Sequence, residues 1–229
     1  MMLQSIDKKK IYFYFFLPFI LLSIHNINFF NSVNDYFKIK KIILISNIEN
    51  SINKEINKSL NQFYNFNIFS INTKEISNTL ENFNIISEYN VKKKYPSSIT
   101  VELKETRILA YYFESNSEKI FIGENGKKIK NEYTLINDPP LIVGQVKIEN
   151  FLNLKKILVN SGLNLNEFSK FYSYKSNRWD LVYQNKLLIM LPIEKVEKAI
   201  IIFKNIVEST NLEDLKTIDL RIEDKIILS

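Results

Sequence analysis

The side chains that could catalyse a reaction are few. The chain has a single histidine, His25, and no cysteine, so it offers neither a thiol nucleophile nor a Cys-based metal site. The serine hydroxyls lack a histidine base for nucleophilic catalysis. His25 has no histidine partner for metal binding or acid–base work, and it follows an apolar run, where a position at a membrane interface explains it better.

Carboxylates near the C-terminus are the other candidates for chemistry. They are Asp180, Asp219, Glu223 and Asp224. A glycoside hydrolase needs two carboxylates that face each other across a cleft, and solvated strand ends are the simpler interpretation here. The sequence also has no Walker loop and no dinucleotide fingerprint. We therefore expect no catalytic residue, no metal and no cofactor, and a membrane-bound hydrolase is only the third hypothesis for function.

Arginine and tryptophan are rare, which makes their positions informative. The three arginines are Arg107, Arg178 and Arg221, in a chain that otherwise uses lysine, and Trp179 is the one tryptophan. A guanidinium donates hydrogen bonds in a planar fork that lysine cannot reproduce. A retained arginine therefore indicates a demand for that geometry. The alternative is that each arginine merely pairs with a nearby carboxylate.

The net charge of +6 could suggest nucleic acid or anionic lipid as a partner. However, 25 acidic residues are interleaved with 31 basic ones, and Lys92–Lys94 is the only short basic run besides Lys8–Lys10. The tyrosines and phenylalanines follow predicted strand and core positions, which disfavours a surface for stacking bases. We expect neither a nucleic acid nor a small-molecule substrate.

The N-terminal residues predict a membrane anchor. Residues 11–30 are mostly apolar and carry no Asp, Glu, Lys or Arg, and twenty helical residues span roughly 30 Å, the thickness of a hydrocarbon core. Lys8–Lys10 precede this run, so we expect residues 1–10 to be cytoplasmic and the rest of the chain to be exported. The alternative is a cleaved signal peptide, but Ser23–Asn26 offers no A-x-A-like cleavage site.

The exported part predicts an α+β fold in two regions. In the first region, residues 37–106, the order is β-α-α-β-β, with capping residues at Asn50 or Ser51 and at Asn72 or Thr73. The predicted elements are strands at 37–46, 85–91 and 98–104 and helices whose apolar stripes are Ile52, Ile56, Leu60 and Ile76, Leu80, Phe83. The second region, residues 107–229, predicts a larger mixed β domain with packed helices.

The second region alternates strands with turn signals and two helical patterns. Asn125-Gly126 and Gln184-Asn185 predict tight turns, and Pro192 fits the start of the second helix. The predicted strands are 108–113, 119–122, 168–174, 178–183, 187–191, 215–221 and 225–228, and the predicted helices are 149–159 and a segment that ends near Glu208. A terminal strand often lies at a sheet edge with unpaired backbone groups, which can accept a partner strand.

Five local strings, in this order, resemble the FtsQ/DivIB family of bacterial cell-division proteins. They are Tyr95–Val101 with Lys104–Arg107, Ile122–Gly126, Pro140–Gly144, Arg178–Leu181 and Ile218–Arg221. The resemblance covers essentially the whole chain. It departs from the family pattern at Asn47, Gly123 and Ile108, where Gly, Asp and Pro are usual, and this weakens the local turn predictions only.

The resemblance implies a single-span inner-membrane protein with a POTRA domain, a β domain and a place at the division septum. In the family, the C-terminal part of the β domain binds the FtsB–FtsL pair, which carries a partner-binding role to Arg221, Ile222, Lys225, Ile226 and Ile227. The strings also imply structural roles for Pro96, Glu105, Arg107, Gly144, Arg178, Trp179 and Asp219. The alternative from another class is a POTRA-bearing component of secretion or envelope assembly.

Overall fold

The computed structural model describes residues 8–23, 33–114, 117–130, 139–209, 212, 215–223 and 225–229. The chain divides into two compact units. The first unit comprises Met1–Phe83 and Tyr89–Lys104, and the second comprises Asn84–Glu88 and Glu105–Ser229. We describe each unit by itself.

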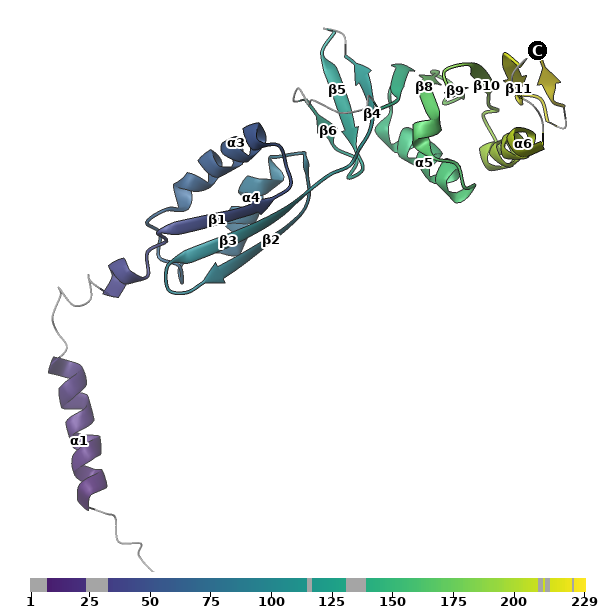
Figure 1. Cartoon of the computed structure of the whole chain (residues 1–229). Coiled ribbons are helices and arrows are strands. Elements are labelled where there is room, and N and C mark those ends of the chain that lie inside the picture. The colour runs from purple at the N-terminus through teal and green to yellow at the C-terminus, as the bar shows by residue number, and fades with distance from the viewer. Residues whose placement is uncertain are drawn as a thin grey trace, which may run out of the picture. The chain divides into compact units, whose positions relative to one another are not determined.

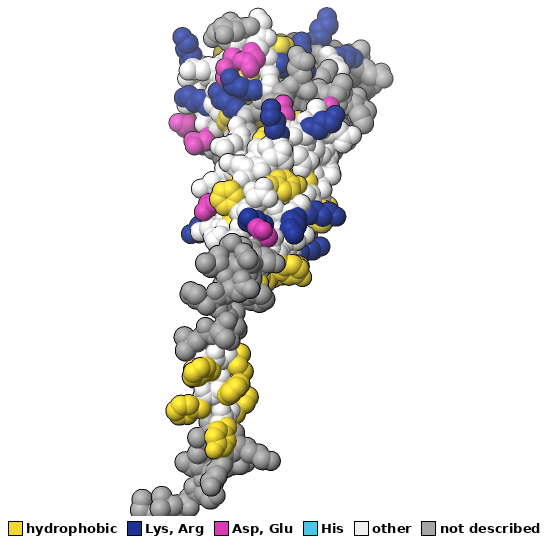
Figure 2. Space-filling view, turned by 90° about the vertical axis from the view of Figure 1, so that its left-hand side faces the viewer, with side chains coloured by type: hydrophobic (Ala, Val, Ile, Leu, Met, Phe, Trp, Pro, Cys, Tyr) yellow, Lys and Arg dark blue, Asp and Glu magenta, His cyan; other side chains and the backbone are white. Residues whose placement is uncertain are grey.

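Helix α1 covers Lys8–Ser23 (Figure 1), and its described side chains, residues 12–21, are apolar and exposed (Figure 2). The predicted span began at Ile11 and ended at Phe30, so the helix starts three residues earlier. Residues 24–30, which include His25, lie outside the described part of the chain. Among the described residues, no helix is both long enough and apolar enough to cross a membrane.

The first unit is built on a three-stranded sheet, and the predicted order β-α-α-β-β is confirmed. The sheet order is β1-β3-β2, with β1 parallel to β3. The elements are β1 (Lys41–Ser46), α3 (Asn50–Leu60), the 3-10 turn η1 (Asn61–Phe63), α4 (Thr73–Glu81), β2 (Ile86–Lys94) and β3 (Ser98–Glu105). Both helices bury the apolar stripes that their spacing predicted, except for Phe83, which follows α4 and is half-buried.

The two helices differ in how they begin. The Asn72 side chain caps α4 by accepting a hydrogen bond from the Lys74 amide at 3.0 Å, as the sequence predicted. The predicted cap of α3 was wrong, because Asn50 is already helical and Glu49 occupies the N-cap without a side-chain bond. The nearby Asn53 instead donates to the Ile48 carbonyl at 2.6 Å, which ties the entering chain to the first turn.

The second unit is a nine-stranded mixed sheet of order β12-β11-β10-β9-β8-β7-β4-β5-β6 (Figure 1). Its strands are β4 (Ile108–Phe113), β5 (Lys119–Gly123), β6 (Lys128–Ile129), β7 (Leu141–Gly144), β8 (Phe168–Ser173), β9 (Trp179–Tyr183), β10 (Leu187–Met190), β11 (Thr217–Asp219) and β12 (Ile227–Leu228). The turn at Gln184 and Asn185 has positive φ at both residues, 47° and 60°, as a tight two-residue hairpin requires.

Two helices and a 3-10 turn complete this unit: α5 (Ile148–Asn160), η2 (Leu165–Glu167) and α6 (Val196–Ser209). The core gathers their apolar stripes with the strands around the fully buried rings of Phe151, Phe168, Phe171 and Phe203. Trp179 belongs to this core, with its ring centroid 6.2 Å from that of Phe151. The prediction that Pro192 starts a helix was wrong, because α6 begins four residues later, at Val196.

Candidate protein-binding site

The C-terminal strand β12 forms one edge of the nine-stranded sheet in the described part of the chain. It pairs antiparallel with β11, Leu228 opposite Ile218 and Ile227 opposite Asp219. Beside this register, Thr217 and Ser229 exchange two backbone hydrogen bonds of 2.9 and 3.1 Å. Thr217 and Ser229 are therefore a hydrogen-bonded pair, and such pairs alternate with pairs that are not bonded to each other.

The alternation determines which backbone groups point outward. Leu228 lies in the next pair along the ladder, so its amide and carbonyl point away from β11 toward the open edge. A row of such groups is a template for one more strand. The side chains here are also apolar and exposed, since Ile227 and Leu228 retain about half of their possible accessible surface, 50% and 46%.

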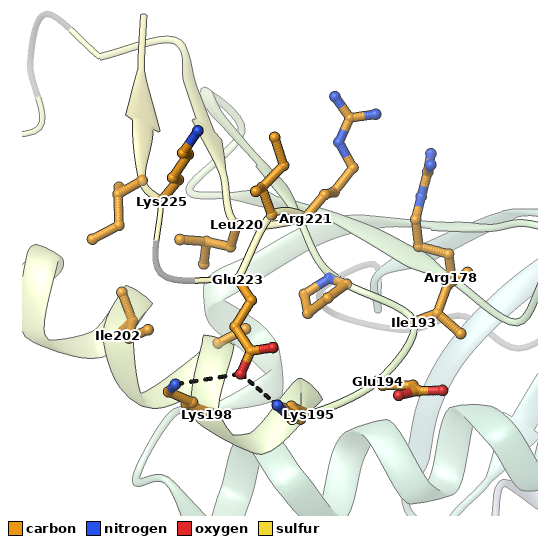
Figure 3. A pocket seen from close by; sticks show the side chains of 14 residues that line it. Arg178, Ile193, Glu194, Lys195, Lys198, Ile202, Leu220, Arg221, Glu223 and Lys225 are labelled. Carbon is orange, nitrogen blue, oxygen red and sulfur yellow. Dashed lines mark hydrogen bonds and ion pairs between the residues drawn. The ribbon is translucent and has the colours of Figure 1, made fainter.

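A groove of about 610 Å³ lies beside this edge, between the start of α6 and the segment that joins β11 to β12 (Figure 3). Leu220 and Ala199 are buried beneath it. Three exposed isoleucines line it, Ile193, Ile222 and Ile226, with exposures of 58%, 51% and 49%. Exposed aliphatic side chains gathered around one hollow mark an interaction site more often than isolated ones do.

Glu223 ties the two walls of the groove together. Its carboxylate forms an ion pair with Lys195, which precedes α6, and lies 3.8 Å from the Lys198 ammonium on the first turn of that helix (Figure 3). All three side chains are more than half exposed, so solvent screens these pairs and their energy is small. Their effect is to position the segment over α6.

The lining of the groove is positively charged. It contains two arginines and three lysines against two glutamates: Arg178, Arg221, Lys195, Lys198 and Lys225 against Glu194 and Glu223. The formal balance is thus +3. An apolar hollow with a cationic rim complements a segment that brings apolar anchors and carboxylates.

Arg221 is held in a fork by Asp219. Its side chain donates to the two carboxylate oxygens at 2.9 and 2.6 Å, and its backbone amide donates to Oδ1 at 3.0 Å. These bonds to the charged form hold the pKa of the Asp219 carboxyl below its usual value and raise the pKa of Arg221. The Arg221 guanidinium makes the bidentate contact that the rarity of arginine suggested. Its partner is a carboxylate two residues away, as in the alternative that each arginine pairs with a nearby carboxylate.

Arg178 forms a second cluster with Asp180 and Tyr174. The guanidinium lies 4.1 Å from the centre of the Tyr174 ring and 3.3 Å from Asp180 Oδ2, which also accepts the Tyr174 hydroxyl at 2.8 Å. Hydrogen bonding to this carboxylate raises the pKa of the Tyr174 phenol. Asp180 is buried, which corrects the expectation of a solvated strand end. The buried Asp180 is thus paired with a cation and bonded to a phenol.

The sheet brings the two arginine strings together. Asp180 on β9 is in register with Met190 on β10, and Met190 is in register with Asp219 on β11. Trp179 points to the opposite, core face because successive strand residues alternate. The string Arg178–Leu181 therefore directs Trp179 into the core and Asp180 to the opposite face of the sheet, and it meets Ile218–Arg221 across β10.

The other predicted structural residues lie elsewhere. Pro96 is in the turn between β2 and β3, Glu105 ends β3, and Arg107 is exposed just before β4. Gly144 ends β7 beside Ser173 of β8. None of these residues lines the groove.

Sequence reasoning missed the α6 side of the site. The residues that it did not select are Pro192, Ile193, Glu194, Lys195, Lys198, Ala199 and Ile202. Their signal was present but weak: Ile193 and Ile202 are apolar residues outside the predicted stripe of Val196, Ile200 and Phe203. Ile193 precedes α6 and Ile202 lies on it; apolar residues outside the stripe indicate a second contact, but they do not say with what.

Comparison with known proteins agrees with this architecture. Residues 37–106 match the family model described as "POTRA domain, FtsQ-type", and residues 110–221 match "Cell division protein FtsQ/DivIB, C-terminal". The chain is 27% identical over 191 residues to the cell division protein FtsQ of Rickettsia bellii (strain RML369-C), which covers 82% of this chain and 71% of the relative. The corresponding proteins of Rickettsia prowazekii and Rickettsia typhi are each 26% identical over the same shares.

A POTRA unit followed by a larger mixed sheet thus defines a class of bacterial cell-division protein. Within that class, the chain belongs to the FtsQ/DivIB family.

Proposed function

We propose that this cell-division protein is a non-enzymatic scaffold of the divisome. In this proposal the apolar residues 11–30 hold it in the inner membrane with residues 1–10 in the cytoplasm, and the two folded regions, residues 37–106 and 107–229, lie in the periplasm at the septum. The C-terminal edge binds FtsB- and FtsL-type partners, and the POTRA region docks components that arrive earlier.

The open edge of β12 is the observation that carries the proposal. The backbone of an incoming partner strand would form hydrogen bonds with the amide and carbonyl of Leu228. Partner side chains next to that strand would enter the groove lined by Ile222 and Ile226. Backbone pairing gives such an interface its affinity and the groove gives it selectivity. The cationic rim favours a partner segment with carboxylates near its apolar anchors.

The anchor is supported by the composition of the N-terminal segment. The described side chains of residues 12–21 of α1 are exposed and include Phe13, Phe15 and Phe16. An apolar helix that leaves its side chains uncovered favours another apolar medium, and lipid is the one that its composition and flanking lysines suit.

Two substitutions at the groove test the proposal, one that reverses a charge and one that replaces an apolar side chain with a carboxylate. We expect Arg221→Glu or Ile222→Glu to abolish co-purification with FtsB- and FtsL-type homologues, because the first inverts the rim charge and the second places a carboxylate among apolar anchors. Circular dichroism of the full chain in detergent should show that the protein stays folded.

Ile201→Glu is the matched control. Ile201 is 52% exposed, close to the 51% of Ile222, and it lies on α6 outside the groove lining. It should leave binding unchanged. Undiminished co-purification of the Arg221 and Ile222 variants would refute partner binding at this edge.

Depletion separates this proposal from a role in envelope assembly. A divisome scaffold predicts filamentous cells, since septation stops while growth continues. A component of secretion or assembly predicts loss of outer-membrane proteins instead. A fluorescent fusion should form a midcell band in the first case.

A further inference from the structure

Four aromatic rings form a continuous ladder on the surface of the first unit. The ring centroids of Tyr36 and Phe37 are 5.3 Å apart, those of Phe37 and Phe69 are 5.0 Å apart, and Phe69 stacks on Tyr95 at 5.0 Å. Tyr36, Phe69 and Tyr95 each expose close to 60% of their surface. We name these four residues the aromatic surface.

The backbone fixes this surface at one end of the small sheet. Three segments meet there: residues 33–41, 64–72 and 92–98. Lys38 bridges to Asn67, the Lys40 amide donates to the Ser97 carbonyl at 2.8 Å, and the Lys93 ammonium donates to the Ile71 carbonyl at 2.7 Å. In Figure 1 this is the end at which β1 begins and the β2–β3 turn lies. The rings are thus held by paired backbone and need no ligand to bring them together.

The same end is strongly basic. The three segments contain six lysines, at positions 38, 40, 41, 92, 93 and 94, and one acidic residue, Asp35. Their formal balance is +5. Asp35 pairs with Lys38 at 2.5 Å, and Lys92 pairs with Glu102 of β3. Lys40, Lys41 and Lys94 are exposed and belong to the same segments as the rings.

The connection to α1 keeps this end near the anchor. Nine residues, 24–32, separate Ser23 at the end of α1 from Val33. Whatever their conformation, ten Cα–Cα steps reach at most about 36 Å. The aromatic surface therefore lies within one short tether of the end of α1.

We propose that the aromatic surface binds the headgroup layer of an anionic bilayer. The inference rests on the proposed membrane attachment and adds a second, peripheral contact to it. Tyrosine combines an apolar ring face with a polar hydroxyl, which is why it gathers at that depth, and phenylalanine adds apolar area on the side that enters the interface. The surrounding lysines complement anionic headgroups. This contact sets the orientation of the POTRA unit on the membrane and leaves its other faces open to partners.

The absence of cysteine from the chain allows a direct test. Ser70→Cys places a nitroxide label beside Phe69 without removing a ring, and Ser51→Cys places one at the start of α3 as a control; both positions are exposed. The full-length protein is reconstituted into phosphatidylcholine vesicles with and without phosphatidylglycerol. Accessibility of each label to oxygen and to a nickel chelate is then measured.

The expected result is a several-fold rise in the oxygen-to-nickel ratio at position 70 in vesicles that contain phosphatidylglycerol, and no rise at position 51. Adding Phe69→Ser should reduce the rise, whereas Phe113→Ser should not, since Phe113 is similarly exposed on β4 of the other unit. Equal ratios at positions 70 and 51 would overturn the inference. A change at position 70 only after a partner protein is added would also overturn it, because it would assign the surface to that protein.

Vesicle flotation distinguishes membrane attachment from the peripheral contact. If the labelled chain fails to float with the vesicles, membrane attachment itself is wrong, and the inference falls with it. If the chain floats but the label at position 70 stays in water, only the peripheral contact is wrong.

Discussion

Gly144 ends β7 at a point where the neighbouring strand leaves no space for a side chain. A Cβ there would lie 2.2 Å from the Ser173 carbonyl oxygen, and φ is +105°. We expect Gly144→Ala to lower the free energy of unfolding by about 3 kcal/mol or more, since a strained backbone alone costs about 1–3 kcal/mol. Urea denaturation followed by Trp179 fluorescence measures this.

Gly126→Ala is the comparison for that variant. Gly126 also has positive φ, +76°, but its nearest neighbour is the flexible end of Leu152 at 3.3 Å. It should lose only about 1 kcal/mol, the cost of the backbone conformation. Equal losses for the two variants would mean that the clash with Ser173 is relieved at no cost.

Asp219 makes the C-terminal edge sensitive to acid. Because Arg221 lowers its folded-state pKa, the pair adds stability that is fully present above the unfolded pKa of about 3.9 and is lost as the pH falls through the lower folded value. We expect Arg221→Gln to bring the titration midpoint of the Asp219 carboxyl, followed by NMR, back toward its usual value. The variant should also lose less stability than the wild type on acidification below about pH 4. Identical midpoints in both proteins would rule out this role for the pair.

The arginines show what residue types alone could predict. Their rarity predicted a demand for forked hydrogen bonding, and Arg221 makes such a fork with a residue two positions away. That local pairing is visible in the sequence. The alignment of Asp180 and Asp219 on either side of Met190 cannot be seen in the sequence, because it depends on a parallel pairing of β10 with β11. Parallel neighbours are joined by long connections that carry no register signal.

At the scale of the element, alternate residues of β12 direct their backbone groups toward β11 and toward the open edge. Leu228→Pro removes an outward amide and leaves the bonds to β11 in place, as proline on an edge strand permits. We expect it to weaken partner binding about tenfold or more, since a lost hydrogen bond costs about 0.5–1.5 kcal/mol and the ring obstructs an added strand. Binding of the full chain to an immobilised FtsB-type partner measures this.

Two further variants isolate the backbone contribution. Leu228→Ala removes the side chain and keeps the amide, so it should bind better than Leu228→Pro. Ile227 lies opposite Asp219 of β11, so Ile227→Pro should instead loosen β12 from β11. Faster amide exchange at Thr217 would show this loosening. If Leu228→Ala were as damaging as Leu228→Pro, binding would depend on the side chain and strand addition would be the wrong mechanism.

Long, periodic elements were predictable and short ones were not. The strand at 108–113 was predicted with the bounds of β4, because six residues allow a pattern to develop. The two-residue β6 was not predicted as a strand, and β11 and β12 are much shorter than the predicted 215–221 and 225–228. Such strands exist because a neighbour supplies their hydrogen bonds. The groove was invisible for a similar reason: α6 and the segment after β11 meet only in the folded unit.

At the scale of the whole molecule, the N-terminal segment is proposed to act as a tether. Holding the binding edge on the same membrane as its partners raises their effective concentration without adding a contact. The segment could contribute either as a tether alone or through contacts of its own. These two roles predict different behaviour when the anchor is exchanged.

Replacing residues 11–30 with an unrelated single-span anchor distinguishes the roles. If the segment is only a tether, the chimera should restore septation in depleted cells and form a midcell band, because the edge, the groove and their local concentration are all preserved. Removing the segment from an otherwise exported chain should fail, since the advantage of co-localisation, commonly 10²–10⁴-fold, is lost. The chimera carrying Ile222→Glu is the negative control. A chimera that reaches the membrane, retains partner binding in detergent and yet leaves cells filamentous would assign a specific contact to residues 11–30.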